Sequence, residues 1–320
     1  MTKITSSLFL AVLLGVCLHV ASAQAQYVRT CVSMAKGNDA NTCHCSQPCR
    51  TFARAHDQTF SDGEITVLDP GDYGGLTITK SISINNDSDG EASITVSGGG
   101  AVGVRINAPA GVGYVNLRGI TIQGVGFGSG QIGVFFTTGF SLTMTNCIVR
   151  NLTGDGIVFN PQSSNARLSV SNTLVADNFG TGIFIQPNGS GFSLHASLNR
   201  VRAFNNGSEG ILLTSGFVTG PSTVRVTAAN SVAAHNGLSG FRAVAVFQTA
   251  SFMVVRSVAA YNKTGISADG SAVMRVGQST VTGNTTSWSA TNGGTLRSYG
   301  DNNMQGNADF DPSPTTIARK

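Results

Sequence analysis

The chain carries little charge, few prolines and a single tryptophan. Charged residues make up 11% of its 320 residues, with 20 Lys and Arg against 16 Asp and Glu. The basic residues form no run, whereas a nucleic-acid-binding surface needs them clustered. We therefore expect no nucleic-acid partner. Beyond the first 25 residues no segment is long and apolar enough for a membrane helix, so we also expect no membrane span.

The one long apolar run stands at the start of the chain, over Leu8–Val20. A lysine precedes it and small residues follow it, so cleavage after Ala23 or Ala25 would complete a secretory signal peptide over residues 1–25. About 13 apolar residues are too few to span a bilayer, which disfavours the alternative of a membrane anchor. Lipid attachment at Cys17 is a further alternative. We expect a secreted, periplasmic or cell-surface protein.

Cysteines are few, and four of them cluster within 19 residues, at Cys31, Cys43, Cys45 and Cys49. This clustering in a short segment fits disulfides formed in an oxidising compartment. We expect the pairs Cys43–Cys49 and Cys31–Cys45, although four cysteines allow three pairings. A zinc knuckle that also uses His44 is the alternative, but the usual spacing of metal-binding cysteine pairs is absent. We expect no metal and no cofactor.

What the sequence does have is a repeat. Six stretches align with one another: TNCIVRN (145–151), SNTLVADN (171–178), NRVRAFNN (199–206), ANSVAAHN (229–236), VRSVAAYN (255–262) and GQSTVTGN (277–284). Each closes on an asparagine, and in the first five a glycine follows within three to five residues. The closing asparagines recur every 22 to 30 residues, a period typical of a solenoid.

One repeat, residues 167–193, predicts one coil of that solenoid. Apolar and polar residues alternate at its start, as in a strand with one buried face. Asn172 can then adopt the left-handed backbone of a sharp bend. A second strand, a turn over residues 178–182 and a third strand follow, so each coil advances the chain by about 4.8 Å. A β-sandwich is the alternative, but it offers no reason for one register shared by six segments.

Stacked coils place equivalent residues in columns. Apolar columns close the core, and Cys147 falls at an inward position, where we expect a buried, inert thiol. Asparagines in two columns can hydrogen-bond up the axis, as amide ladders do in other stacked sheets. The residues of these expected ladders are Asn146, Asn172, Asn178, Asn206, Asn230, Asn236, Asn262 and Asn284.

The ends of the chain depart from the repeat. Residues 26–62 form a disulfide-bearing segment with a short helix over Thr51–Gln58, which we expect to cap the solenoid. The β-helix itself is expected over residues 63–309, in about nine to ten coils. The last residues, 310–320, are expected to form a loose tail.

The chain resembles the right-handed parallel β-helix proteins of the pectate-lyase-like superfamily, in particular its secreted bacterial repeat proteins. The resemblance rests on PCRTFARA, GEITVLDPGDYG and LTITKSISI near the start, on the N-x-x-V-x-x-N-x-x-x-G-I repeats and on SYGDN near the end. It covers residues 29–307 and implies an all-β, right-handed helix. It implies little about chemistry, because that superfamily includes lyases, glycosidases, esterases, epimerases and non-enzymes.

The resemblance also implies a ligand-binding face, on the strands that follow each glycine. Four apolar residues there are bracketed by two arginines, and side-chain amides lie beside them. Such a surface marks a contact site, unless a loop, the tail or a neighbouring subunit covers it. The residues of this expected face are Arg105, Phe135, Val158, Asn160, Phe184, Gln186, Leu212 and Arg242.

Catalytic residues are harder to identify. A calcium-dependent lyase needs several carboxylates on adjacent coils, yet Asp269 is the one acidic residue expected on this face, and no Gly-His-Gly segment is present. The remaining carboxylates, Asp155 and Glu209, each precede a coil glycine two coils apart. With Arg242 they are the candidate catalytic residues, and the alternative is that they are ordinary turn residues.

We therefore predict an exported β-helix protein with a carbohydrate- or surface-associated binding or structural role, without a complete catalytic site. The predicted partner is a polysaccharide. One alternative is a polysaccharide lyase or glycoside hydrolase that acts on an acidic polysaccharide. Another is an oligomeric, adhesin-like rod in which the apolar residues form the contact between subunits.

Overall fold

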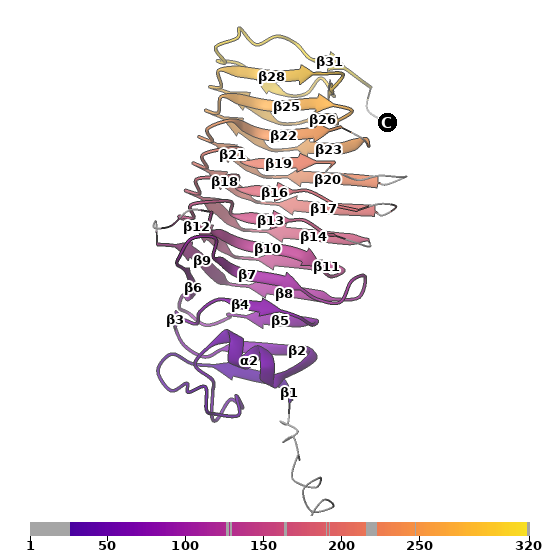
Figure 1. The fold of residues 1–320 in the computed structure, drawn as a ribbon. Helices are drawn as coiled ribbons and strands as arrows, with labels where there is room; N and C mark the ends of the chain where they lie inside the picture. Colours follow the sequence, from indigo (N-terminus) through magenta and orange to yellow (C-terminus); the bar gives the residue numbers. More distant parts are fainter. Residues whose placement is uncertain are drawn as a thin grey trace, which may run out of the picture.

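A computed structural model describes residues 26–318 apart from 126, 127, 129, 163, 164, 190, 192, 216–222 and 247. The predicted signal peptide, with its cleavage sites and Cys17, lies outside the described residues. Three all-parallel sheets wind around a common axis as a right-handed parallel β-helix, which confirms the predicted architecture (Figure 1). No helix among the described residues is long and apolar enough to cross a membrane.

Nine successive coils each contribute one strand to each sheet, in the chain order A, B, C, and sheets A and B have additional strands at the ends of the helix. Sheet A has twelve strands: β1 Tyr27–Val32, β2 Thr59–Val67, β5 Ile82–Asn85, β8 Tyr114–Arg118, β11 Ser141–Thr145, β14 Ala166–Ser171, β17 Ser193–Asn199, β20 Thr223–Ala229, β23 Ala250–Val255, β26 Val273–Gly277, β29 Thr295–Ser298 and β31 Thr315–Thr316. Sheet B has ten: β3 Gly71–Asp72, β6 Ala92–Val96, β9 Ile120–Gly124, β12 Ile148–Arg150, β15 Leu174–Ala176, β18 Arg202–Phe204, β21 Val232–Ala234, β24 Val258–Ala260, β27 Thr280–Thr282 and β30 Asn303–Met304. Sheet C has nine: β4 Leu76–Ile78, β7 Val102–Asn107, β10 Ile132–Thr138, β13 Ile157–Phe159, β16 Ile183–Ile185, β19 Ile211–Thr214, β22 Ser239–Ala245, β25 Thr264–Gly270 and β28 Thr286–Thr291.

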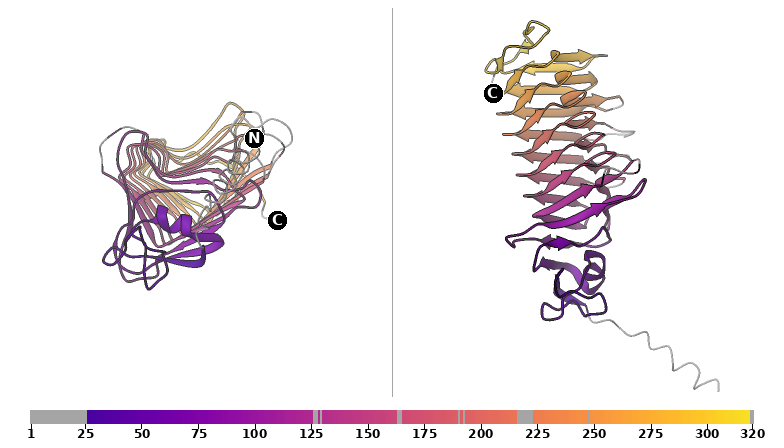
Figure 2. Two further views of the ribbon diagram at one scale, coloured as in Figure 1. Left: turned by 60° about the horizontal axis from the view of Figure 1, so that its bottom comes forward. Right: turned by 90° about the vertical axis from the view of Figure 1, so that its left-hand side faces the viewer.

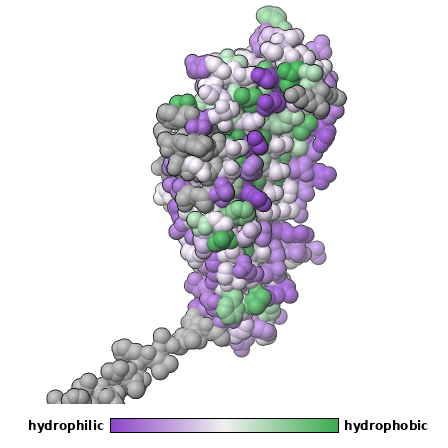
Figure 3. Space-filling model, turned by 90° about the vertical axis from the view of Figure 1, so that its right-hand side faces the viewer, coloured by the Kyte–Doolittle hydropathy of each residue, from purple (hydrophilic) through white to green (hydrophobic). Residues whose placement is uncertain are grey.

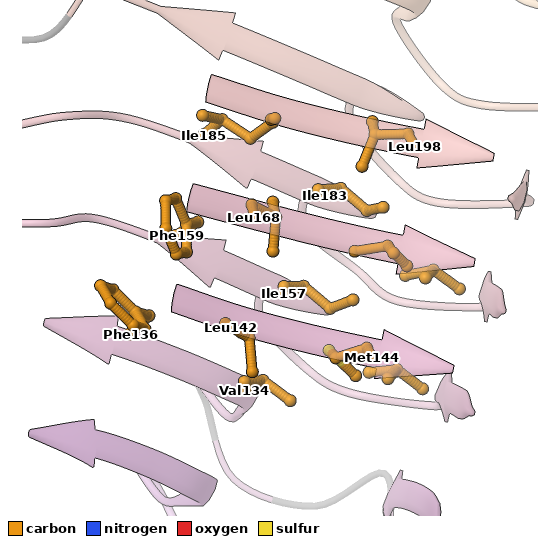
Figure 4. Packing of buried hydrophobic residues seen from close by; sticks show 14 of the residues in the cluster. Val134, Phe136, Leu142, Met144, Ile157, Phe159, Leu168, Ile183, Ile185 and Leu198 are labelled. Carbon is orange, nitrogen blue, oxygen red and sulfur yellow. The ribbon is translucent and has the colours of Figure 1, made fainter. Parts of the chain in front are cut away.

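The core consists of apolar columns that run along the axis (Figure 4). On sheet C, Val134 pairs with Ile157 and Ile157 with Ile183, and all three are fully buried. Facing them on sheet A, Leu142 pairs with Leu168. Cys147 is 1% exposed and burial raises the pKa of its thiol, which makes this side chain a poor nucleophile.

The glycine at the start of the sheet C strands before β28 is explained by crowding between coils. A Cβ atom on Gly156 would lie 2.6 Å from the carbonyl oxygen of Gly182, and one on Gly182 would lie equally close to that of Gly210. No side chain fits at such a distance, so the column is glycine from Gly156 to Gly265, and Ser287 takes the position on β28, the edge strand of sheet C. This close approach sets the spacing at which the neighbouring turn residues meet.

The N-terminal segment joins the sheets rather than preceding them. β1 pairs with β2, so sheet A begins within the predicted disulfide segment. Cys31 is bonded to Cys45 and Cys43 to Cys49, which excludes the zinc knuckle because the thiols are consumed. The helix α2, Phe52–Gln58, begins after Thr51, whose hydroxyl accepts a hydrogen bond from the Arg54 amide at 3.2 Å. It lies at the N-terminal end of the stack (Figure 2).

The C-terminal tail differs from the prediction. Residues 310–320 were expected to be loose, but β31 within them pairs with β29 and extends sheet A by one strand. The amide of Ile317 also donates to the carbonyl of Ser298 at 2.8 Å. The edge of β29 offers unpaired backbone groups, and the tail satisfies part of them.

Candidate functional site

The expected ligand-binding face lies on the outward side of sheet C. The parallel register pairs Arg105 with Phe135, Phe135 with Val158 and Val158 with Phe184. It continues from Phe184 to Leu212 and on to Arg242. The structure therefore brings these six side chains into one column across six neighbouring strands, β7 to β22. The two arginines end the apolar part of the column, as the sequence pattern suggested.

The apolar residues of this column are less exposed than the pattern suggested. Val158 is 6% exposed, and Phe135, Phe184 and Leu212 are only partly exposed. Side chains on adjacent coils stand about 4.8 Å apart, so each covers part of the next. The guanidinium of Arg105 also lies 5.1 Å from the centre of the Phe135 ring. The column is thus a shallow ridge of stacked side chains, not an open apolar patch.

Polar side chains accompany the apolar column at the ends of the strands. The amide of Asn160 donates to the side-chain oxygen of Gln186 at 3.3 Å, and Gln162 donates to Asn160 at 2.6 Å. In β10 the register shifts, so that Thr138 rather than Thr137 lies beside Asn107 and bonds to it at 2.7 Å. Amides and hydroxyls therefore line the edge of the face over several coils.

The candidate carboxylates lie at the N-terminal ends of the sheet C strands, whereas the amides described above lie at the C-terminal ends. Asp155, Thr181 and Glu209 occupy one column, each just before a coil glycine. The backbone amide of Thr181 donates to Asp155 at 2.6 Å, and its hydroxyl lies 3.4 Å from a carboxylate oxygen of Glu209. Thr181 thus connects the two carboxylates. Sequence reasoning missed this residue, although its place before Gly182 matches that of Asp155 before Gly156.

Arg242 completes this group. Its guanidinium lies 3.0 Å from Glu209 and 3.6 Å from Asp269. Glu209 is 4% exposed, and a carboxylate buried to this degree needs such a partner. The structure therefore brings Asp155, Glu209 and Arg242 into one network and adds Thr181 and Asp269 to it. Much of the network is structural, because Arg242 is engaged by protein carboxylates.

The carboxyl groups of this network have different environments. Burial raises the pKa of Asp155, the charge of Glu209 raises it further, and the Thr181 amide opposes both. The pKa of Asp269 is lowered, first by a hydrogen bond from Asn292 and also by Arg242. Asp155 and Asp269 stand four coils apart in sheet C, so their opposite pKa displacements do not make them an acid–base pair. Within the described residues, no group of three His, Cys, Asp or Glu side chains is placed to hold a metal ion.

The expected asparagine ladders separate into two kinds of site. Asn178, Asn206, Asn236 and Asn262 are buried at the turn between sheets B and C, and each side-chain amide donates to the next asparagine at 2.9 to 3.1 Å. Asn284 continues the series to Asn307, which sequence reasoning missed. Asn146, Asn172 and Asn230 instead lie exposed at the bend between sheets A and B, with positive φ angles.

One asparagine of the repeat was aligned wrongly. The sheet register pairs Arg150 with Ala176, so Asn151 matches Asp177 and the buried Leu152 matches Asn178. The first repeat is one residue shorter than the second between its strand and its closing asparagine. Aligning the two closing asparagines therefore matched Asn151 to Asn178 instead of to Asp177. The ladder therefore begins at Asn178, whose side-chain oxygen accepts from the Leu152 amide at 3.2 Å.

No protein-family model matches this chain, and no curated protein matches it either. Among solved structures it is similar to pectate lyase Pel9A, with a TM-score of 0.57 and 17% identity over 92% of this chain and 78% of that chain. It is also similar to the A-module of the mannuronan C-5 epimerase AlgE4 of Azotobacter vinelandii, with a TM-score of 0.46 and 13% identity over 81% of this chain and 91% of that one. The likeness to Pel9A shows that the two chains share the parallel β-helix fold.

The surface gives no sign of one dominant apolar contact area on the flank drawn in Figure 3, where apolar atoms occur in separate small groups. Among the described residues before the C-terminal tail, the most exposed large apolar side chain is Phe179, at 80%, on the turn that carries the ladder. It has no large neighbour in its column on the next two coils, where the matching residues are Gly207 and Gly237.

Proposed function

We propose that the protein is exported and binds a polysaccharide along the outward face of sheet C. The observation that carries this proposal is the continuous column from Arg105 to Arg242, with amide and hydroxyl side chains beside it. At about 4.8 Å per coil the column is roughly 24 Å long. A face of this length suits several sugar rings of an extended chain rather than one small molecule.

The chemistry of the two columns matches that of a sugar chain. Each pyranose ring has C–H groups that pack on aromatic and aliphatic side chains, here Phe135, Phe184 and Leu212. Its hydroxyls pair with amides such as those of Asn160 and Gln186. The fold supports the same assignment, since a similar structure with a TM-score of 0.57 is named a pectate lyase. The two disulfides fit an extracytoplasmic compartment.

Binding is tested by affinity electrophoresis of the full mature chain in gels that contain polygalacturonate, alginate or dextran. We expect retardation by at least one of them. Phe184→Ser should weaken that binding about tenfold or more, because Phe184 stands in the middle of the column. Phe179→Ser is the matched control: it makes the same change at an exposed site on another face. Equal loss in both variants, or retardation by none of the three polymers, contradicts the proposal.

A second candidate function, cleavage of the bound chain, is favoured by one observation, the linkage of Asp155 to Glu209 through Thr181. The raised pKa of Asp155 suits the acid of glycoside hydrolysis, and Glu209 would then be the second carboxylate of that reaction. Incubation with the same polymers would then release reducing or unsaturated ends, and Asp155→Asn would abolish the release. If the wild type binds a polymer but releases no ends, cleavage is contradicted and binding is the supported function.

A further inference from the structure

A groove crosses the outward face of sheet A, away from the face discussed above. It has a volume of about 540 Å³ and runs over the strands from β8 to β20. A second hollow of about 360 Å³ reaches on to β26, and Arg225 lines both. Together they form one track along the axis, which we call the arginine groove.

The floor of the arginine groove is made of short hydroxyl side chains. The register of sheet A pairs Thr143 with Ser169, Ser169 with Ser197 and Ser197 with Thr227, so one hydroxyl per coil points outward. None of the four hydroxyls has a hydrogen-bond partner within the described part of the protein. They are small enough to leave the groove open, and they are available to a ligand.

Basic side chains form one wall of the groove. The strand register places Arg167 beside His195 and His195 beside Arg225, and all three side chains are exposed. Arg167 lies 4.9 Å from the centre of the Phe140 ring, and Tyr114, which is 51% exposed, meets the same ring edge-on at 5.2 Å. The aromatic pair closes the N-terminal end of the groove and holds the guanidinium of Arg167 in place.

The positive charge of this wall is not neutralised by the protein. Arg167 and Arg225 have no ion-pair partner among the described residues, and the eight described strands of sheet A from β8 to β29 contain no Asp or Glu. Sheet C differs, because there the guanidinium of Arg242 forms ion pairs with Glu209 and Asp269. An unpaired arginine in a groove is suited to an anion, which its planar guanidinium can bind through two parallel hydrogen bonds.

We propose that the arginine groove is a second binding site, for an acidic polysaccharide that carries carboxylate or sulfate groups. Arg167 and Arg225 stand two coils apart, about 10 Å, and bind acidic groups along one chain. The hydroxyl floor pairs with sugar hydroxyls between them, and Tyr114 offers a ring face to a terminal sugar. Single-stranded nucleic acid fits less well, because it needs aromatic platforms in succession, and here they occur at one end alone.

The test measures binding of the full mature chain to polygalacturonate, dextran sulfate and uncharged dextran, at low and at physiological salt. We expect binding to at least one of the two acidic polymers, weakening as salt rises, and no effect of Arg225→Ser on any binding to uncharged dextran. Binding to polygalacturonate would indicate recognition of carboxylates, and binding to dextran sulfate would indicate recognition of sulfates. Arg225→Ser should weaken that binding at least fivefold and Arg167→Ser with Arg225→Ser together at least twentyfold. Thermal melts check that each variant stays folded, since both side chains are exposed.

Arg202→Ser is the matched control, because Arg202 is an exposed arginine on sheet B and its loss changes the net charge equally. Equal weakening by Arg202→Ser and Arg225→Ser would show attraction by net charge alone and overturn the proposal. Binding of a single-stranded oligonucleotide that is tighter than binding of either polymer, and is lost in Arg225→Ser, would replace it with a nucleic-acid site. Weakening by Phe184→Ser but not by Arg225→Ser would retain the sheet C site and overturn the arginine groove.

Discussion

The two bends that flank sheet B both use asparagine, and for different physical reasons. At the bend between sheets A and B the asparagines are exposed and have φ angles near +50°, and Arg200, Arg256 and Gln278 take the same position with the same backbone conformation. At the turn between sheets B and C the asparagines are buried, and their amides bond from coil to coil. The left-handed residue of that turn is the one before, such as Asp177 or His235.

The difference separates a backbone requirement from a side-chain requirement. A left-handed bend accepts any residue that tolerates the conformation, at a cost of about 1–2 kcal/mol for most. The ladder needs one group that donates and accepts at once, which the carboxamide of asparagine supplies. At its two ends the series stops on other groups: the Leu152 amide at one end and the Asp311 carboxylate, 2.7 Å from Asn307, at the other.

The largest effect is expected for Asn236→Ala, in the middle of the ladder. Asn236 donates to Asn262 at 3.0 Å and to the Ala203 carbonyl at 3.1 Å, and it accepts from the amides of Asn206 at 3.0 and 3.2 Å. Removal leaves buried groups without partners, so the free energy of unfolding should fall by about 3–5 kcal/mol. Urea unfolding followed by circular dichroism measures it. A loss below about 1 kcal/mol would contradict the role of the ladder.

Gly182→Ala tests the close approach that brings ladder residues together. The new Cβ would lie 2.6 Å from the Gly210 carbonyl and 2.8 Å from the Asn206 amide, so the coils must separate. We expect a loss of about 2–3 kcal/mol, as for other overpacked sites. Gly191→Ala is the control, because its Cβ would meet nothing within 4 Å and only the positive φ of 67° opposes it. An equal loss at both glycines would show that crowding between coils is unimportant.

Asn230→Ala makes the same substitution as Asn236→Ala on the same coil, at the other bend. Asn230 is exposed with a φ angle of 51°, and its side-chain bonds to Asn199 and Arg256 lie at the surface, where water can replace them. Alanine should therefore cost about 1 kcal/mol, mainly for the left-handed conformation. Asn230→Gly should recover most of that loss, since Gly119 already serves this bend with a φ angle of 69°. If Asn230→Ala cost as much as Asn236→Ala in the urea experiment, the distinction between the two bends would be wrong.

The smallest expected effect is that of Asp155→Asn, next to the ladder turn. Because burial raises the pKa of Asp155, its ionised form costs stability; that cost is absent below the unfolded pKa of 3.8 and complete above the folded pKa. Asparagine keeps the acceptor for the Thr181 amide, so the variant should be slightly more stable than the wild type at pH 7. The gain should disappear near pH 3.5. Urea midpoints at both pH values measure it, with the exposed Asp89→Asn as control; a gain that persists at pH 3.5 would exclude the titration as its cause.

Much of the fold could be read from local patterns. The alternation of apolar residues, the recurring glycine and the period of the repeat each report on one coil at a time, and the structure confirms the coils they predict. The alignment failed at Asn151, because the first repeat is one residue shorter and only the pairing of Arg150 with Ala176 reveals it. The prediction of a loose tail also differs from the structure, because β31 pairs with the open edge of β29. That edge exists only once the coils are stacked.

The candidate site was only partly predictable for the same reason. Column membership follows from period and register, so the sequence places the residues from Arg105 to Arg242 in the one column that the strand pairing shows. The exposure of Val158 and the linking role of Thr181 depend on side chains from neighbouring coils. The arginine groove has no motif at all, since its arginines stand 58 residues apart, at Arg167 and Arg225.

The amino-acid order by itself determined the coil, because bends, strand faces and crowded glycines are set by residues close together in the chain. Stacking decided which of those residues are buried, paired or left charged. Those properties depend on neighbours more than twenty positions away, which come within hydrogen-bonding distance only after the coils have closed on one another.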